Sequence, residues 1–430
     1  MCEDSRSERR YWMQRVEQLR KEMEQEDLAR EVGAPPGPAA GSVEPQPLPV
    51  ARAGWTVGSI VACAVVALAI MLLSTQSPAA TFVYVSNAED GDIGMYTLQA
   101  DGSLRPGQRY KAEKIVMPMT VSPDKRFLVA AVRSKPFSAY SYTIDRATGA
   151  LNLVGTGPLA ESFPYIFHDR SGRFLLGASY GGHMVSVNPV GADGRVGEPM
   201  QVIPTARNAH AIITDRTGRY VFVPHLGTDQ VFQFVFDQKS GRLTANTPPL
   251  IQLKAGTGPR HLITSSDNRF VYLLNELTAT VTTLALDGKT GLLSEVSSVS
   301  ALPPDSKLVP GGARGPGAPE RNRDNDIWAS DIHLTPNGRF LYAAERTTSS
   351  IGAFSVDGAS GKLTYLGSTP TEKQPRGFRI DPTGRFMVVS GEKSETLTTY
   401  SIDAATGALK TIGQYPTGKG SNWVEIVSFD

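Results

Sequence analysis

The stretch GTGPRHLITSSDNRFVYLLNEL, residues 256–277, contains two short apolar runs separated by the turn sequence SSDN. Each run has the length of a β-strand, and two such runs joined by a polar turn are typical of a β-hairpin. Arg260 stands at the start of the first run and Glu276 at the end of the second. Because the two strands of a hairpin are antiparallel, we expect Arg260 and Glu276 to be neighbours.

The same pattern recurs along the chain from about residue 80 onward. An aromatic residue begins the second run of each unit, and a turn such as SPDK, DRSG, DRTG, TPNG or DPTG precedes all but the first. The aromatic residues are Phe82, Phe127, Phe174, Tyr220, Phe270, Phe340 and Phe386. A second turn, such as ATGAL, KSGRL or ASGKL, recurs later in the units. Successive aromatic residues are 45, 47, 46, 50, 70 and 46 residues apart. Repeats of this length predict an all-β fold, a seven-bladed β-propeller with four strands per blade.

The two ends of the repeat region are incomplete in complementary ways. The first unit lacks an upstream strand and turn, whereas the C-terminal SNWVEIVSF, residues 421–429, is a strand without a unit of its own. We expect the two to form one blade, which closes the ring and removes both exposed sheet edges. The longest interval between aromatic residues contains an insertion at 301–326, rich in Gly, Pro and charge. It predicts a long loop, of the kind that often borders a functional site.

The residues before the propeller, which we expect at 81–430, divide into three segments. Residues 1–32 predict a charged amphipathic helix, and residues 33–53 are a Pro- and Gly-rich linker. Residues 54–74 carry no charged side chain, a length sufficient to span a membrane. Positive charge precedes this segment and is absent directly after it, which favours an exported propeller that is periplasmic or extracytoplasmic. The small residues at 77–80 leave a cleaved signal peptide as the alternative to a transmembrane anchor.

The composition excludes several classes of partner and site. Lys plus Arg (43) nearly balances Asp plus Glu (42), so the net charge does not indicate a nucleic-acid partner. The two cysteines, Cys2 and Cys63, precede the repeats, which excludes a disulfide framework or a cysteine metal site in the propeller. No cluster of acidic or histidine ligands is predicted either, so we expect neither a metal nor another cofactor.

Extending the hairpin geometry to every unit predicts a polar rim around the central channel. The innermost strands begin near Met117, Pro164, His210, Arg260, Ser330 and Arg376. The second strands end near Arg133, Tyr180, Leu226, Glu276, Arg346 and Glu392. Arg376 faces Glu392 in its own blade, so a structural ion pair and a substrate contact are both open. Arg133 and Arg346 have no carboxylate opposite them in their own blades, which indicates an anionic ligand bound there.

This rim contains the groups that hydrolysis of an activated ester requires. His210 or Glu276 is the candidate general base for an attacking water, and Arg260 and Arg346 are candidates to stabilise the developing oxyanion. His261 is a candidate substrate-binding residue, although strand alternation would turn it into the blade and give it a structural role. No serine is identified with an adjacent base, so covalent acyl-enzyme chemistry is not indicated.

From about residue 81 to 430 the chain resembles the seven-bladed propeller 6-phosphogluconolactonases, and more broadly the lactonase and carboxymuconate-cyclase propellers. The resemblance is carried by PMTVSPDKRFLVAAVR, GTGPRHLITSSDNRFVYLLNEL, WASDIHLTPNGRFLYAAERT and PTEKQPRGFRIDPTGRF. It implies metal-independent hydrolysis of a sugar-acid lactone, most simply 6-phosphogluconolactone to 6-phosphogluconate. It also implies that the family's site falls on His210, Arg260, Glu276 and Arg346.

Two other functions fit the same rim. A non-catalytic propeller would bind an anionic ligand or a partner protein there without turnover, and a muconate-type cycloisomerase would use the arginines on carboxylates. The uncharged segment at 54–74 is also not typical of a cytoplasmic enzyme. An exported propeller would meet a different lactone from the intracellular phosphorylated one.

Overall fold

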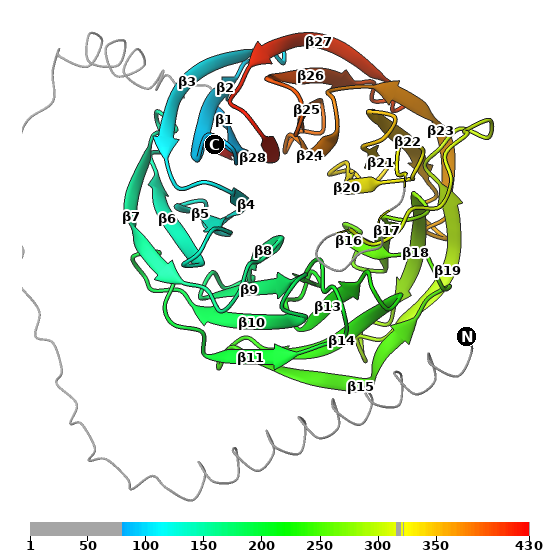
Figure 1. Cartoon of the computed structure of the whole chain (residues 1–430), viewed down its shortest axis with the longest axis horizontal. Helices are drawn as coiled ribbons and strands as arrows, with labels where there is room; N and C mark the ends of the chain where they lie inside the picture. Colours follow the sequence, from blue (N-terminus) through cyan, green and yellow to red (C-terminus); the bar gives the residue numbers. More distant parts are fainter. Residues whose placement is uncertain (1–79, 315–319, 321, 430) are drawn as a thin grey trace, which may run out of the picture.

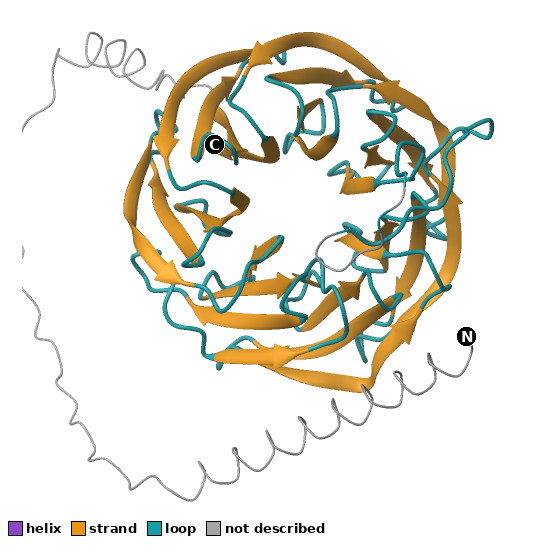
Figure 2. Cartoon of the chain, viewed as in Figure 1, coloured by secondary structure: helices purple, strands orange, loops and turns teal. Residues whose placement is uncertain are grey.

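The structure is a computed structural model that describes residues 80–314, 320 and 322–429. These residues form strands and loops arranged as a closed ring around a central channel (Figures 1 and 2). There are seven sheets of four antiparallel strands each, which confirms the predicted seven-bladed β-propeller. The segments predicted at 1–32, 33–53 and 54–74 lie outside the described residues. Within the described part of the chain, no helix is long and apolar enough to cross a membrane.

The strands of each blade follow one another from the channel to the outside of the ring, and one blade is built from the first and last strands of the propeller. That blade contains β28 (Ser421–Phe429), β1 (Ala80–Asn87), β2 (Asp92–Leu98) and β3 (Leu104–Lys111). The second blade contains β4 (Val116–Val121), β5 (Phe127–Val132), β6 (Ser138–Ile144) and β7 (Leu151–Pro158). The third contains β8 (Tyr165–His168), β9 (Phe174–Ser179), β10 (Met184–Pro189) and β11 (Gln201–Pro204). The fourth contains β12 (Ile213–Thr214), β13 (Tyr220–His225), β14 (Gln230–Asp237) and β15 (Arg242–Gln252). The fifth contains β16 (Pro259–Thr264), β17 (Phe270–Asn275), β18 (Thr280–Leu286) and β19 (Leu293–Ser300). The sixth contains β20 (Ala329–Leu334), β21 (Phe340–Glu345), β22 (Ser350–Val356) and β23 (Leu363–Pro370). The seventh contains β24 (Pro375–Ile380), β25 (Phe386–Gly391), β26 (Thr396–Ile402) and β27 (Leu409–Pro416).

The ring closes where the sequence predicted it. The C-terminal strand β28 is the innermost strand of its blade and pairs with β1 along nearly its whole length, from Ala80 opposite Phe429 to Asn87 opposite Ser421. Figure 1 shows the two strands side by side. Closure therefore satisfies the backbone groups of β1 that a missing inner strand would leave unpaired.

The burial of each strand explains its composition. The second strands of six blades, such as β17 and β21, are buried at every residue because both of their faces pack against neighbouring blades. The outermost strands alternate between buried and exposed residues, as in β23, since one face meets solvent. The second strands are therefore continuous apolar runs, whereas the outermost strands have mixed polarity.

Each aromatic residue that marks a repeat packs against a glycine of the following blade. Gly149, between β6 and β7, has a φ of +74°, and a Cβ placed on it would lie 2.4 Å from the Phe82 ring. Only glycine combines this backbone conformation with so close an approach. The other contacts around the ring pair Phe127 with Gly194, Phe174 with Gly241, Tyr220 with Gly291, Phe270 with Gly361, Phe340 with Gly407 and Phe386 with Gly102. The repeated aromatic and the repeated turn are thus the two halves of one contact between blades.

A bulge positions the first residues of the innermost strands. In the β16–β17 pair, Pro259 lies opposite Asn275 and His261 opposite Leu274, so Arg260 is an extra residue. Equivalent register shifts occur between β20 and β21 and between β24 and β25. A bulge re-aims the side chains on either side of it, so that Arg260 reaches Glu276 and the next residue, His261, reaches Asp331 of the neighbouring blade.

Candidate functional site

Three charged side chains from two neighbouring blades meet at the rim. Nε of Arg260 donates to Oε2 of Glu276 at 2.7 Å, and Nη2 of Arg346 donates to the same oxygen at 3.1 Å. The side chains of Arg260, Glu276 and Arg346 are 1%, 5% and 2% exposed. A single carboxylate therefore compensates two guanidinium groups that have been removed from water.

Each of these arginines keeps one terminal nitrogen without a hydrogen bond. Arg260 uses Nε on Glu276 and Nη1 on the carbonyl of Ser330. Arg346 uses Nε on the carbonyl of Trp328, and Nη2 on Glu276 and the carbonyl of Ala329. Among the described residues, Nη2 of Arg260 and Nη1 of Arg346 have no hydrogen-bond acceptor. Two donors are therefore left for a ligand oxygen.

The charges continue from this cluster towards the opening of the channel. Nη1 of Arg346 lies 4.0 Å from Oε2 of Glu392, and Nη1 of Arg376 lies 3.3 Å from Oε1 of the same carboxylate. Arg376, Glu392, Arg346, Glu276 and Arg260 thus form an alternating series across three blades. Alternation keeps the net charge of this series at about one positive unit, although five charged side chains meet there.

Arg346 has no carboxylate partner in its own blade, as predicted, but it is not unpaired. Its own blade offers none, but Glu276 of the preceding blade and Glu392 of the following blade both approach it. The hairpin geometry of a single blade does not show these two partners, because the inner strands of neighbouring blades converge at the channel. Arg133, by contrast, has no carboxylate within ion-pair distance in the described residues. It donates from Nε to Oγ of Ser162 at 2.9 Å.

His210 lies beside the arginines as an uncharged imidazole. Its side chain is buried, its Nδ1 has no partner in residues 80–314, 320 and 322–429, and its ring is 5.6 Å from that of Tyr180. Burial and the positive charge of Arg260 hold the pKa of His210 well below its usual range. The imidazole is therefore neutral at physiological pH and can accept a proton.

His261 contacts His210 and is fixed from behind by an acid. The two rings are 5.3 Å apart, and Nδ1 of His261 lies 2.9 Å from Oδ1 of Asp331. Burial raises the pKa of Asp331, but His333 and His261 outweigh burial and hold this pKa well below its usual range. The carboxylate therefore accepts a hydrogen bond from Nδ1 of His261. His261 therefore faces the channel. The alternative prediction, that strand alternation turns this side chain into the blade, is wrong. The bulge at Pro259 accounts for the difference.

The predicted insertion covers the buried cluster. The ring of Trp328 lies between two guanidinium groups, with the Arg346 carbon 3.7 Å and the Arg314 carbon 3.9 Å from the ring centroid. The hydroxyl of Tyr180 donates to the carbonyl of Arg314 at 2.9 Å, and the amide of Gly311 donates to the carbonyl of Leu277 at 2.8 Å. These contacts hold the described part of the insertion across the blades that carry Glu276 and Arg346.

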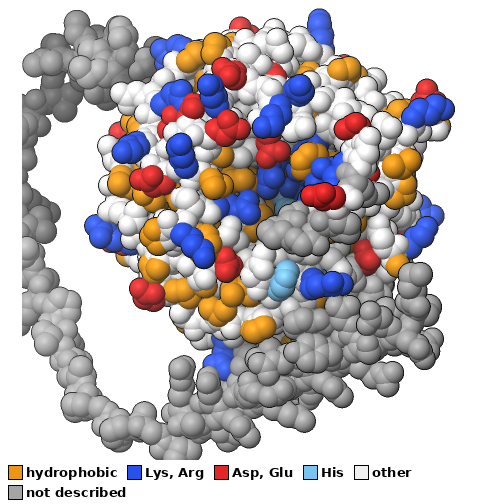
Figure 3. Space-filling view, in the orientation of Figure 1, with side chains coloured by type: hydrophobic (Ala, Val, Ile, Leu, Met, Phe, Trp, Pro, Cys, Tyr) orange, Lys and Arg blue, Asp and Glu red, His pale blue; other side chains and the backbone are white. Residues whose placement is uncertain are grey.

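An open cavity adjoins the cluster on the same face. Its volume is about 720 Å³, and its lining residues include Met117, Arg133, Trp328, Arg376, Glu392 and Asn422. Lys114 and Lys393 also line it, and Figure 3 shows Lys and Arg side chains gathered around the hollow centre of this face. The structure therefore divides the predicted residues. Arg133 and Arg376 line the open cavity, while His210, Arg260, Glu276 and Arg346 are buried near it. His261 is also buried, but it lies against His210 and does not line this cavity.

Three contributors were missing from the predicted site. Glu392 links the two halves, Trp328 covers Arg346, and Asp331 orients His261. Glu392 is the predicted partner of Arg376, and the geometry of one blade does not show that it also approaches Arg346. Asp331 directly follows Ser330 and is therefore not one of the strand starts that define the predicted rim.

Known proteins resemble this chain along the whole propeller. A family model described as "Lactonase, 7-bladed beta-propeller" matches residues 79–426. A protein named 6-phosphogluconolactonase from Pectobacterium carotovorum is 38% identical over 299 residues, which are 70% of this chain and 84% of that protein. One of the same name from Serratia proteamaculans is also 38% identical with the same coverage. A solved periplasmic gluconolactonase from Pseudomonas aeruginosa has a TM-score of 0.71 and 27% identity, covering 82% of this chain and 100% of that chain.

Proposed function

Because the chain belongs to the seven-bladed β-propeller lactonase family, we propose that its rim site hydrolyses a sugar-acid lactone, most simply 6-phosphogluconolactone to 6-phosphogluconate. Two similar relatives are named 6-phosphogluconolactonase and a similar solved structure is a periplasmic gluconolactonase, and lactone hydrolysis is the chemistry that these names share. One observation carries the assignment to the rim. Two buried arginines share Glu276 and each keep one free donor beside a neutral histidine.

The free donors supply the electrophilic part of the reaction. Nη2 of Arg260 and Nη1 of Arg346 donate to the lactone carbonyl oxygen, which becomes an oxyanion when water adds to the carbon. Donors held in place by Glu276 and backbone carbonyls need little reorganisation at that moment. Both arginines are buried, so each hydrogen bond to the oxyanion acts in a medium of low dielectric.

His210 supplies the proton transfers. The neutral imidazole takes one proton from the attacking water as the new C–O bond forms. The tetrahedral intermediate then expels the ring oxygen, and the imidazolium returns the proton to it. The sum is lactone plus water giving the open hydroxy acid. Burial beside Arg260, which keeps the pKa of His210 low, favours the return of the proton. Oε1 of Glu276, which has no hydrogen bond to the described residues, is the alternative acceptor.

Arg133 and Arg376 bind the anionic end of the substrate. Both line the open cavity next to the buried cluster, and Arg133 has no carboxylate partner in the described part of the chain. A guanidinium in this position matches a phosphate through two parallel hydrogen bonds. The lactone ring would then lie towards Trp328. Because the four inner side chains are at most 5% exposed, entry of the ring requires Trp328 to leave its position over Arg346.

The uncharged run at 54–74 supports an extracytoplasmic position for this propeller. The similar gluconolactonase from Pseudomonas aeruginosa is periplasmic by name, which accords with export. Cell fractionation tests this: full-length protein is expected with the membranes or outside the cytoplasm, and a chain starting at Thr81 in the soluble fraction. Recovery of full-length protein in the cytosol would exclude both the anchor and export.

A substrate panel tests the proposed reaction. Purified protein is assayed for acid release from 6-phosphogluconolactone, gluconolactone and a muconolactone, each corrected for spontaneous hydrolysis. Turnover of the sugar lactones supports the proposal, and preference for the phosphorylated one supports the role of Arg133 and Arg376. Saturable binding without turnover of any lactone would establish a binding propeller instead. Conversion of muconolactone alone, to the unsaturated diacid and without addition of water, would establish the cycloisomerase.

A further inference from the structure

A second cavity occupies the other half of the channel. Its volume is about 380 Å³, and it shares no lining residue with the open cavity at Arg133. The inner strands begin at the rim described above and end at the turns that carry Pro123, Arg170 and Arg216. Because these three residues line the second cavity, it lies at the opposite end of the channel.

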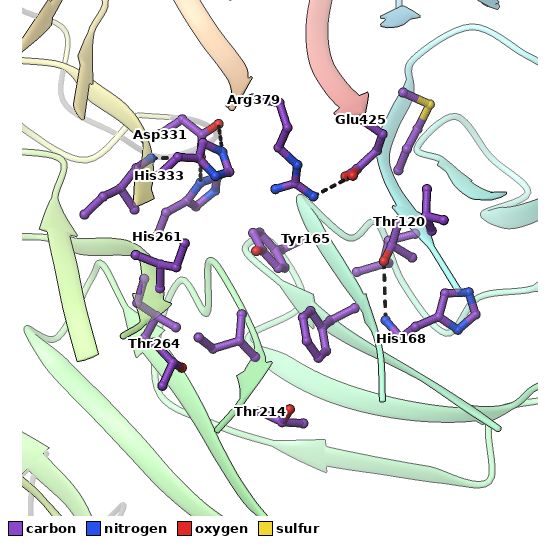
Figure 4. Close-up of a pocket in the computed structure, with 18 of the residues that line it drawn as sticks. Thr120, Tyr165, His168, Thr214, His261, Thr264, Asp331, His333, Arg379 and Glu425 are labelled. Atoms are coloured by element: carbon purple, nitrogen blue, oxygen red, sulfur yellow. Dashed lines mark hydrogen bonds and ion pairs between the residues drawn. The ribbon is translucent and has the colours of Figure 1, made fainter. Parts of the chain in front are cut away.

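A layer of rings forms the inner end of this cavity. The Tyr165 ring centroid is 5.0 Å from that of His261 and 5.5 Å from that of Trp423, and the latter two are 6.1 Å apart. Figure 4 shows Tyr165 in the middle of the pocket with His261 beside it. The three rings come from separate blades and fill the channel between the two cavities. A ligand in the second cavity is therefore separated from the rim cluster.

The two carboxylates of this cavity are already occupied by protein partners. Glu425 accepts hydrogen bonds from Arg379 at 2.5 Å and from Nε1 of Trp423 at 2.9 Å. Asp331 contacts both His261 and His333, at 2.9 and 3.1 Å, as the dashed lines of Figure 4 show. Neither acid is thus free to receive a cation or a donor-rich ligand without losing a buried partner.

Several donors of the cavity, in contrast, have no acceptor. Arg379 uses one terminal nitrogen on Glu425, and its side chain is 32% exposed. Its other two nitrogens, and the hydroxyl of Tyr165, make no hydrogen bond to the described residues. Burial raises the pKa of Tyr165, so this hydroxyl remains a donor. At the mouth, Arg170 makes no hydrogen bond or ion pair within the described part of the chain, and Arg216 uses only Nε, on the carbonyl of Ser265.

Arginine at the mouth is specific to two neighbouring blades. The turns after the inner strands place Pro123, Arg170, Arg216, Ser266, Pro336 and Pro382 at equivalent positions. Only Arg170 and Arg216 in this set are charged, and they are close enough for each to affect the other electrostatically. With Arg379, three arginines line a space that contains two carboxylates, each with a protein partner. The excess of positive charge and of free donors favours an anion.

We propose that this second cavity binds a small organic anion, with a carboxylate or phosphate group held by Arg379 and the Tyr165 hydroxyl and with Arg170 and Arg216 at the entrance. The binding rests on these residues alone and is independent of the reaction at the rim. Carboxylate and phosphate offer the same oxygen acceptors to a guanidinium, so the proposal includes both groups. The cavity volume suits a ligand the size of a sugar acid rather than a polymer.

Calorimetric titration of the full-length protein tests the proposal with three probes: gluconate, inorganic phosphate and glucose. The protein carries Arg133→Ala to weaken binding at the rim. Gluconate or phosphate is expected to bind and glucose is not, since glucose has no anionic group. Tighter binding of gluconate would identify a carboxylate ligand, and tighter binding of phosphate a phosphate monoester.

Two variants locate the binding. Arg170→Ala/Arg216→Ala, and separately Arg379→Gln, are each expected to weaken anion binding by about tenfold or more, the loss that one charge-assisted hydrogen bond represents. The control Arg105→Ala/Arg195→Ala removes the same charge from exposed positions outside the cavity and is expected to bind like its parent. In an otherwise unmodified chain, Arg170→Ala/Arg216→Ala is expected to retain lactone hydrolysis within about twofold.

Equal affinity in the Arg170→Ala/Arg216→Ala variant and its parent would overturn the proposal, as would loss of binding in the control pair. Absence of anion binding in the parent at millimolar concentration would also overturn it. Failure of the rim to hydrolyse any lactone leaves these binding measurements intact, so the two proposals fail separately.

Discussion

Arg260 donates a hydrogen bond from Nε to Oε2 of Glu276 across 2.7 Å, with both side chains buried at the rim of the channel. The two residues are sixteen positions apart and lie at the start of one strand and just after the end of the next. Because Arg346 reaches the same oxygen, Glu276 is the centre of the charge arrangement on which the proposed chemistry depends.

Removal of the Glu276 charge is expected to destabilise the propeller. Glu276→Gln leaves two buried guanidinium groups without their shared carboxylate, a loss typically of about 3–5 kcal/mol in the free energy of unfolding. Denaturant titration measures it. The control Glu89→Gln breaks an exposed pair with Lys393 and should cost at most about 1 kcal/mol. Equal small losses in both variants would mean that Glu276 does not compensate the arginines.

The role of Arg133 is tested by comparing two substrates. Arg133→Ala removes a guanidinium that has no carboxylate partner among the described residues. The substitution is therefore expected to weaken binding of the substrate's phosphate group. KM for 6-phosphogluconolactone should rise about ten- to 150-fold, and KM for gluconolactone much less. Arg105→Ala, an exposed arginine of β3, serves as the charge-matched control. A similar rise for both substrates would assign Arg133 to the lactone ring.

The contact between aromatic and glycine predicts the cost of a single methyl group. Gly149→Ala places a Cβ 2.4 Å from the Phe82 ring at a φ of +74°. Gly256 has a φ of +80° with nothing within 4 Å of the added atom, so Gly256→Ala isolates the backbone strain, about 1–2 kcal/mol. Gly149→Ala should cost about 1–3 kcal/mol more, from overpacking. Equal decreases in melting temperature for the two variants would show that the Phe82 ring moves aside with no loss of stability.

Buried histidines predict that the fold loses stability in mild acid. Burial lowers the pKa of His225 to about 3, of His261 to about 3 and of His168 to about 4, against an ordinary value of 6.5. Below about pH 6.5 the unfolded chain binds protons that the folded chain does not, so the free energy of unfolding falls as pH falls. Each histidine contributes about 1.4 kcal/mol per pH unit in that range.

One variant isolates this effect. His225 packs on Phe232 with both ring nitrogens unpartnered in the described residues, so His225→Phe keeps the packing and removes one titrating group. The variant should lose less stability than the parent between pH 6.5 and 5, by about 2 kcal/mol. Parallel curves of unfolding free energy against pH would rule out a buried neutral histidine at this position.

The fold was predictable because each local signal was repeated. Phe82 and its equivalents mark a strand, and the glycines of the second turn fit against their rings, so the two signals report one contact between blades. The pairing of β28 with β1 followed from an unpaired strand at each end of the repeats. Antiparallel geometry within one blade likewise predicted the proximity of Arg260 and Glu276.

The rest of the site depends on contacts between blades, which the spacing of one repeat does not contain. The partners of Arg346 are Glu276 and Glu392, each in a different blade. The pairing of Arg379 with Glu425 joins β24 to the C-terminal strand. Whether such residues meet is decided by the convergence of the inner strands at the channel. The position of Trp328 over Arg346 depends further on the path of the insertion, for which the sequence carries no periodic signal.

The central claim is that the buried cluster around His210 hydrolyses the lactone, and the most direct test is the turnover number of the His210→Gln variant. With folding verified by circular dichroism, kcat should fall by about 10² to 10⁴ for both 6-phosphogluconolactone and gluconolactone, since the base serves either ring. The control His225→Phe changes a buried histidine whose ring packs on Phe232, so this variant should retain its activity. A kcat within about twofold of the parent for His210→Gln on both substrates would contradict the account.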